Sequence, residues 1–171
     1  MSSQTKTFIL DLVKVLATSL ILAGIVRWLV FMPFRVQGAS MEENFHESDY
    51  LIIDRVSPNF SSYHRGEVIV FKFGGDWRTY YIKRIIALPQ ETIEIKTGKV
   101  YINDALLPEE DYLFSKTPGE LKYQLKADEY FVMGDNRAKS SDSRSWGPIK
   151  KDYIVGPVFL RLFPLNDFKF F

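Results

Sequence analysis

Three stretches of the sequence carry side chains that can do chemistry together, and the first contains a serine. Ser40 follows Gly38-Ala39, so its hydroxyl is expected on a tight bend where glycine relaxes the backbone. A serine nucleophile needs a neighbouring base and hydrogen-bond donors for the oxyanion. Taken alone, a serine after glycine is usually only a turn residue, so the chain must also supply a base.

The run from Tyr80 to Ile86 supplies a candidate base. Alternation along a strand places Lys83 and Arg84 on opposite faces of an otherwise apolar segment, so one of the two cations is expected to face an interior. Arginine keeps its proton, whereas full burial can lower a lysine pKa by up to about 3 to 5 units. Lys83 is therefore the predicted neutral base, although a lysine on an arbitrary strand more often guards a sheet edge.

A polar loop from Gly134 to Gly147 follows an apolar strand and concentrates hydrogen-bonding side chains. Asp142 and Arg144 are spaced to pair and brace the backbone, and the Ser140 hydroxyl can hold a lysine amine in line. The residue order fails the calcium-loop pattern, and a two-carboxylate hydrolase leaves the lysine without a role. Taken alone, this stretch is equally well read as a plain surface loop.

Composition excludes several classes of function. The chain has 171 residues, enough for one core but too few for two ordinary domains. Its 22 Lys and Arg balance 21 Asp and Glu without a basic stripe, which argues against a nucleic-acid partner. There is no cysteine for a disulfide or a thiolate site. The two histidines, His46 and His64, lack the spacing of zinc ligands, so no metal or other cofactor is expected.

The N-terminal stretch predicts a membrane anchor. Leu12 to Met32 is apolar and supplies the roughly 20 residues that span a bilayer, with Lys14 and Arg27 near opposite interfaces. We expect this helix to end at Pro33. A cleaved signal peptide and an amphipathic helix on the bilayer surface are the alternatives. Charges flank the stretch on both sides and leave its orientation open.

Beyond residue 34, short β-branched and aromatic runs separated by turn residues predict a mostly β domain at 35–171. The clearest local prediction is a hairpin, because apolar and polar residues alternate on both sides of Thr97-Gly98. The polar stretch from Leu113 to Asp128 is expected to be a loop. Strands are predicted at Tyr50–Val56, Glu67–Phe73, Thr79–Ile86, Glu91–Lys96, Lys99–Asn103, Tyr130–Met133 and Ile154–Leu162.

Together these features resemble bacterial type I signal peptidases, also called leader peptidases, over nearly the whole chain. The most specific motif is the loop that reads GDNRAKSSDSRSWG from Gly134 to Gly147. The resemblance implies two antiparallel β-sheets preceded by one transmembrane helix. The other matching segments are Ser40-Met41 after the short anchor, Arg65-Gly66-Glu67-Val68-Ile69-Val70-Phe71, and Tyr81-Ile82-Lys83-Arg84 with Leu88-Pro89.

The resemblance implies a function. Such an enzyme is a membrane-anchored serine endopeptidase that removes signal peptides from exported preproteins through an acyl-enzyme, without a cofactor. Residues 1–34 would be a cytoplasmic tail and signal anchor, crossing the cell membrane once, and residues 35–171 an extracytoplasmic catalytic domain. Site roles carried over are Ser40 as nucleophile, Lys83 as general base, Ser140 as orienter of the lysine, Asp142 with Arg144 as a structural pair, Gly38 in support, and Met41 and Tyr81 in substrate binding.

Some positions depart from the family pattern. Ser-Met-x-Pro-Thr-Leu appears here as Ser40-Met41-Glu42-Glu43-Asn44-Phe45, and Gly-Leu-Pro-Gly-Asp as Ala87-Leu88-Pro89-Gln90-Glu91. Gly38 stands where some members have a serine that helps form the oxyanion hole. Backbone amides, including that of Ser40, must then suffice.

Three other interpretations are open at this level. A self-cleaving serine-lysine protease of the repressor type would share the sheet and the two residues but lack a membrane anchor. A catalytically silent, membrane-anchored binding module could keep the same fold. A serine-histidine pair would use His46 or His64, neither of which belongs to a matched motif.

Overall fold

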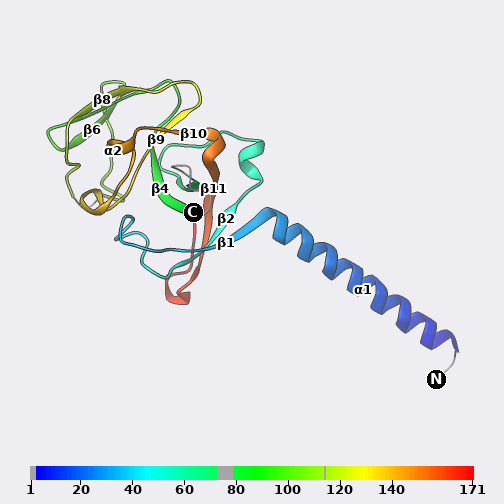
Figure 1. Cartoon of the computed structure of the whole chain (residues 1–171). Helices are drawn as coiled ribbons and strands as arrows, with labels where there is room; N and C mark the ends of the chain where they lie inside the picture. Colours follow the sequence, from blue (N-terminus) through cyan, green and yellow to red (C-terminus); the bar gives the residue numbers. More distant parts are fainter. Residues whose placement is uncertain (1–2, 73–78, 114) are drawn as a thin grey trace.

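The structure is a computed structural model that describes residues 3–72, 79–113 and 115–171. It consists of two antiparallel sheets and a long N-terminal helix that projects away from them (Figure 1). The predicted fold class is therefore confirmed. The seven predicted strands are all present, with ends within about two residues of the expected ones. Phe73, the predicted end of one strand, lies outside the described residues.

Helix α1 (Ser3–Val30) contains a 22-residue apolar stretch, Gln4–Ile25, with a mean hydropathy of 2.1 and no part buried in the protein. It is long and apolar enough to cross a membrane. The expected end at Pro33 is wrong, because the helix stops at Val30 and strand β1 (Phe31–Arg35) follows directly. Proline is tolerated there because β1 is an edge strand of the sheet.

The larger sheet has the strand order β1-β2-β11-β3-β4-β9-β10, with β12 paired to β11. Strand β1 crosses the predicted domain boundary at residue 34 and pairs with β2 from Phe31 opposite Asp54 to Arg35 opposite Tyr50. The remaining strands of this sheet are β2 (Tyr50–Asp54), β3 (Val68–Lys72), β4 (Tyr80–Ala87), β9 (Glu129–Met133), β10 (Ile149–Lys150), β11 (Ile154–Phe163) and β12 (Lys169–Phe170).

The smaller sheet has the order β7-β6-β5-β8, from Ala105–Leu106, Lys99–Ile102, Thr92–Lys96 and Leu121–Gln124. The hairpin predicted at Thr97-Gly98 is confirmed, since β5 and β6 pair antiparallel across it. The loop expected over residues 113–128 is wrong in part, because β8 forms inside it. Leu121 and Tyr123 pack on the core of this sheet while their neighbours face solvent, a two-residue alternation that the polar composition obscured.

Three apolar clusters hold the sheets together. One lies between the two sheets, where Ile93 and Ile95 of β5 pack with Phe131 and Met133 of β9. Another lies under the segment after β1 and includes Met41 and Phe45. The third packs β3, β4 and β9 against the loop before β3. Each fully buried side chain of this size contributes about 1.5 to 3 kcal/mol to the free energy of folding. The clusters therefore hold β4 and β9 in fixed positions.

Candidate active site

Ser40 lies on a turn between β1 and β2. The turn requires Gly38, whose φ of 83° lies in the left-handed region that side chains rarely adopt. After the serine, the Phe45 N–H donates to the Met41 carbonyl at 2.9 Å and closes a tight turn. The Ser40 carbonyl in turn accepts the Asn136 N–H at 3.1 Å. The half-buried hydroxyl is thus tied to the loop that follows β9.

Lys83 on β4 points at this hydroxyl. Its Nζ lies 2.8 Å from Ser40 Oγ and 2.9 Å from the Ile82 carbonyl oxygen, and the residue is only 4% exposed. Burial lowers the pKa of Lys83 from 10.5 to about 8, against the opposing pull of the Asp142 and Asp135 carboxylates. The amine can therefore lose its proton near neutral pH.

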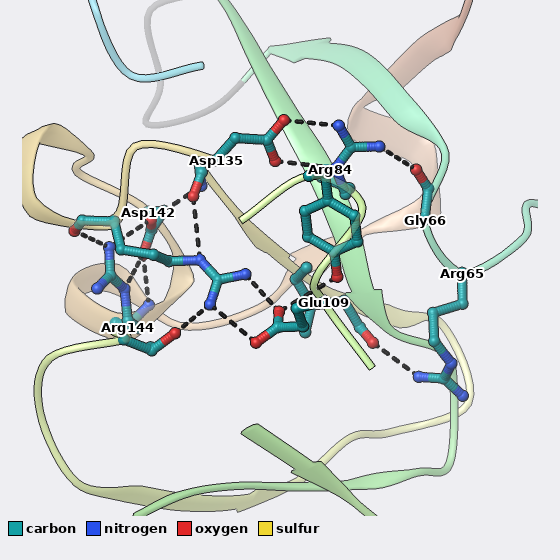
Figure 2. Close-up of polar contacts among 12 residues, drawn as sticks. Arg65, Gly66, Arg84, Glu109, Asp135, Asp142 and Arg144 are labelled. Atoms are coloured by element: carbon teal, nitrogen blue, oxygen red, sulfur yellow. Dashed lines mark hydrogen bonds and ion pairs between the residues drawn. The ribbon is translucent and has the colours of Figure 1, made fainter. Parts of the chain in front are cut away.

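Arg84 points to the opposite side of the strand, as the alternation predicted. Its Nε and Nη2 donate to the two oxygens of Asp135 at 2.8 and 2.6 Å, and its Nη1 donates to the Gly66 carbonyl at 2.7 Å (Figure 2). Such two-point pairing restricts both side chains. Because Asp135 lies two residues after the end of β9, the ion pair fastens the polar loop to β4 beside the lysine.

Asp142 and Arg144 form the pair that their spacing suggested. Arg144 Nε and Nη2 each donate to Asp142 at 2.8 Å, and Nη2 also donates to the Arg137 carbonyl at 2.7 Å (Figure 2). Burial raises the pKa of Asp142, but the Arg144 hydrogen bond and the Gly134 N–H outweigh it, so the net pKa is lowered. The carboxylate stays charged and braces both ends of the loop.

Ser140 and Gly134 pack against the back of the serine. Ser140 Oγ is buried and has no hydrogen-bond partner among the described residues, so its predicted contact with Lys83 is not formed here. The lysine bonds to Ser40 and the Ile82 carbonyl instead. A methyl group on Gly134 would lie 2.3 Å from both Ser140 Oγ and the Ser40 carbonyl oxygen, so only glycine fits.

A groove of about 460 Å³ opens in front of the serine and lysine. Tyr81, predicted to bind substrate, lines it and is 38% exposed. Met41, assigned the same role, does not line this groove: it is 1% exposed and packs in the core with Phe45. A substrate contact through its side chain would require that core to open. The groove is lined by Pro33, Phe34, Arg35, Val36, Gln37, Ser40, Thr79, Tyr80, Tyr81, Ile82 and Lys83.

Two further contacts of the site were missed from the sequence. Asn44 donates to Asp135 at 3.0 Å and to the Tyr112 carbonyl at 2.8 Å, so this departure from the family pattern is a structural link. The sequence feature that could have pointed to Asn44 was its position in the segment that carries the nucleophile. The second contact joins Arg137 and Glu109, with Arg137 Nη2 2.5 Å from Glu109 Oε1. The two residues are 28 positions apart in the sequence, so no local pattern predicted their contact.

Glu109→Gln is expected to destabilise the fold strongly. The Arg137 side chain is fully buried, and besides Glu109 it donates to Thr117 and to the Gly134 carbonyl. Removing the charge of Glu109 leaves a buried guanidinium without its counter-ion, which costs about 3 to 5 kcal/mol. Chemical denaturation measures the loss. The matched control is Glu110→Gln, next to it and exposed, which should change stability by less than about 0.5 kcal/mol. Equal effects of the two variants would contradict the assignment.

The histidines take no part in this arrangement as described. The backbone N–H of His46 donates to Asp49, and that of His64 donates to Glu67. Lys83, and neither histidine, makes the described hydrogen bond to the Ser40 hydroxyl. A serine hydroxyl beside a buried amine, on a fold of two β-sheets, is compatible with the class of serine hydrolases.

Comparison with known proteins agrees with this class. The family described as signal peptidase, peptidase S26, matches residues 9–163. Signal peptidase I P of Bacillus subtilis subsp. natto is 35% identical over 94% of this chain and 92% of its own length. The probable signal peptidase I-2 of Synechocystis sp. is 33% identical over 91% of this chain and 74% of its own length.

A solved structure is similar as well. The crystal structure of a signal peptidase I from Enterococcus faecalis V583 superposes with a TM-score of 0.50 and 29% sequence identity, over 57% of this chain and 97% of that one. The chain therefore belongs to the signal peptidase family, peptidase S26. Its enzyme class is that of the serine endopeptidases.

Proposed function

We propose that this protein is a membrane-anchored type I signal peptidase that cuts signal peptides from exported preproteins, with Ser40 as nucleophile and Lys83 as general base. The single observation that carries the proposal is the 2.8 Å contact between Ser40 Oγ and a lysine amine that is almost wholly buried. A protonated surface lysine has no use as a base, whereas a desolvated one is poised to take a proton.

The chemistry is acyl transfer. Neutral Lys83 takes the Ser40 proton as Oγ attacks the scissile carbonyl carbon, and the new lysine proton then passes to the leaving amine. Water, deprotonated by the same amine, later releases the acyl group and restores the serine. The Ser40 N–H has no acceptor within the described ranges, so it is available to stabilise the oxyanion where this chain has Gly38 in place of a hydroxyl donor.

The groove suits an extended peptide. Strand β4 pairs with β3 along Tyr80 to Arg84, but its pairing with β9 covers only Arg84 to Ala87. The second edge of β4 is thus unpaired, within the described residues, along the stretch that leads to Lys83. A preprotein can add to this edge by main-chain hydrogen bonds. In this proposal the preprotein carries small side chains at the first and third positions before the cut.

The anchor keeps the groove at the bilayer surface. Helix α1 runs without a break into β1, and β1 lines the groove, so the site stays within a few residues of the lipid interface. In this proposal residues 1–34 hold the tail and a single membrane crossing, and residues 35–171 form the catalytic domain on the extracytoplasmic side. Signal peptides emerge there with their apolar segments in the same bilayer.

The test is cleavage of a purified precursor by the full chain in detergent micelles. Mass spectrometry of the products should show one cut at the end of the signal peptide for the wild type and none for Ser40→Ala. Binding of the precursor without cleavage would instead support the catalytically silent module. Cleavage that survives in Ser40→Ala but is lost in a histidine variant would overturn the assignment of the nucleophile.

Activity is expected to rise with pH through an apparent pKa of about 8. The base must be neutral to take the Ser40 proton, and burial lowers the pKa of Lys83 to about 8, so the active fraction grows as pH rises through that value. The measurement is kcat/KM from pH 6 to 10, with the rate falling about tenfold for each pH unit well below the pKa. A flat profile would contradict a lysine base.

A further inference from the structure

The turn that carries Ser40 is supported from behind by a distant segment. Phe45, five residues after the serine, is fully buried, and its ring stacks on Phe171 with centroids 5.0 Å apart and planes at 25°. The Phe171 N–H donates to the Phe159 carbonyl of β11 at 3.1 Å, which extends the pairing of β12 with that strand. The residue that follows β12 thereby reaches the loop that carries Ser40.

Arg161 of β11 contacts both Phe45 and Phe171. It is 5% exposed, and its guanidinium carbon lies 5.5 Å from the Phe45 ring and 5.9 Å from the Phe171 ring. Its Nη1 donates to the Asn44 carbonyl at 2.8 Å and to Asp49 at 3.2 Å. A buried guanidinium satisfied in this way holds its partners in one geometry.

Arg161 also fastens the segment after β11. Its Nε donates to the Asp167 carbonyl at 2.9 Å, and its Nη2 lies 2.7 Å from the Asp167 carboxylate. No local pattern singles out Arg161, because its contact with Asn44 spans 117 residues. The side chain therefore connects the turn before β12 to the turn after Ser40.

We propose that Arg161 and Phe171 are positioning residues that press the Ser40 turn against Lys83. The proposal rests on the proposed function of the serine and the lysine. Neither residue lines the groove, so both act only through the loop they support. Because reacting groups must be held within a fraction of an ångström, a loosened support lowers the rate without weakening substrate binding.

The inference also predicts a change in the pKa of Lys83. If the turn moves away, the Lys83 amine becomes hydrated, and its pKa rises toward the ordinary value. The charged groups that act on it, Asp142 and Asp135, belong to the loop after β9 and not to the turn itself. The rise in activity with pH should then shift to higher pH.

The experiment compares Phe171→Ala with Phe170→Ala in the full chain. The two neighbours are similarly exposed, Phe171 at 48% and Phe170 at 59%, but they differ in their ring contacts. Phe171 stacks on Phe45, whereas the described ring contacts of Phe170 are with Phe159 and Phe168. Phe171→Ala should lower kcat for a precursor about tenfold and leave KM within about twofold. The rise of its activity with pH should lie at a higher pH than in the wild type. Phe170→Ala should match the wild type. Phe171→Trp should keep the wild-type rate, since its ring can still stack on Phe45. Arg161→Lys should lower the rate.

Hydrogen exchange separates this inference from the proposed function. Peptides covering residues 41–49 should exchange faster in Phe171→Ala than in Phe170→Ala, whatever the substrate turns out to be. If the wild type cuts no precursor but Phe171→Ala still exchanges faster than Phe170→Ala, the support by Phe171 stands and only the proposed function is refuted. Equal exchange, kcat and pH profile in the two variants would overturn the inference, as would a change in KM alone.

Discussion

Lys83→Met is expected to lower kcat/KM for precursor cleavage by about 1,000-fold or more. Methionine fills nearly the same volume, so the change removes the amine 2.8 Å from Ser40 Oγ and little else. A general base contributes about 100- to 10,000-fold, and here the same amine also delivers the proton to the leaving group. The measurement is initial rates on a purified precursor.

The control for this variant is Lys99→Met, which replaces an exposed lysine on the β5–β6 hairpin and should retain full activity.

The stability of Lys83→Met gives a second measurement. The pKa of Lys83 is about 8 in the folded chain against 10.5 in the unfolded chain. Burying the protonated amine therefore costs the wild type stability at low pH, and this cost disappears as pH rises through that range. The stability advantage of Lys83→Met should therefore shrink as pH rises from about 8 to 10.5. Normal cleavage by Lys83→Met would refute the mechanism.

Gly134→Ala is expected to lower kcat about 100-fold and to destabilise the fold by about 1 to 3 kcal/mol. The new methyl group would lie 2.3 Å from the Ser40 carbonyl oxygen and from Ser140 Oγ, so the serine backbone has to move. That movement stretches the Asn136 hydrogen bond and shifts Oγ relative to the lysine. Steady-state kinetics and thermal unfolding measure the two effects.

Gly24→Ala is the matched control for this substitution. It adds the same methyl group to a glycine in α1 with no atom within 4 Å and no positive φ. Its activity and stability should stay close to those of the wild type. If Gly134→Ala kept its full rate, the close packing of the loop against Ser40 would have no part in catalysis.

Three buried or half-buried arginine-carboxylate pairs surround the loop after β9. Arg84 with Asp135 ties it to β4, Arg144 with Asp142 closes it on itself, and Arg137 with Glu109 ties it to the segment after β7. Buried ion pairs contribute little net stability compared with apolar packing, but each permits only one geometry. Their value at this site is therefore the fixed position of the loop against Ser40 and Lys83.

Local patterns in the sequence determined much of this protein. Alternation and turn residues located seven of the strands and the hairpin at Thr97-Gly98, and an apolar run located α1. The same alternation separated Lys83 from Arg84 and pointed to the lysine as the base. These features follow from the two-residue repeat of a strand and from the ability of lysine, unlike arginine, to lose a proton. They can therefore be recognised without knowing which distant residues come into contact.

Only the tertiary structure decided which distant groups meet. Asn44 reaches Asp135 across 91 residues, and Arg161 reaches the Asn44 carbonyl across 117. It also decided that Met41 faces the core, that Pro33 lies in a strand, and that β8 adds to β5 from a polar stretch. Such contacts depend on how sheets pack and on which buried charges can be neutralised, and both are set by the whole fold rather than by neighbouring residues.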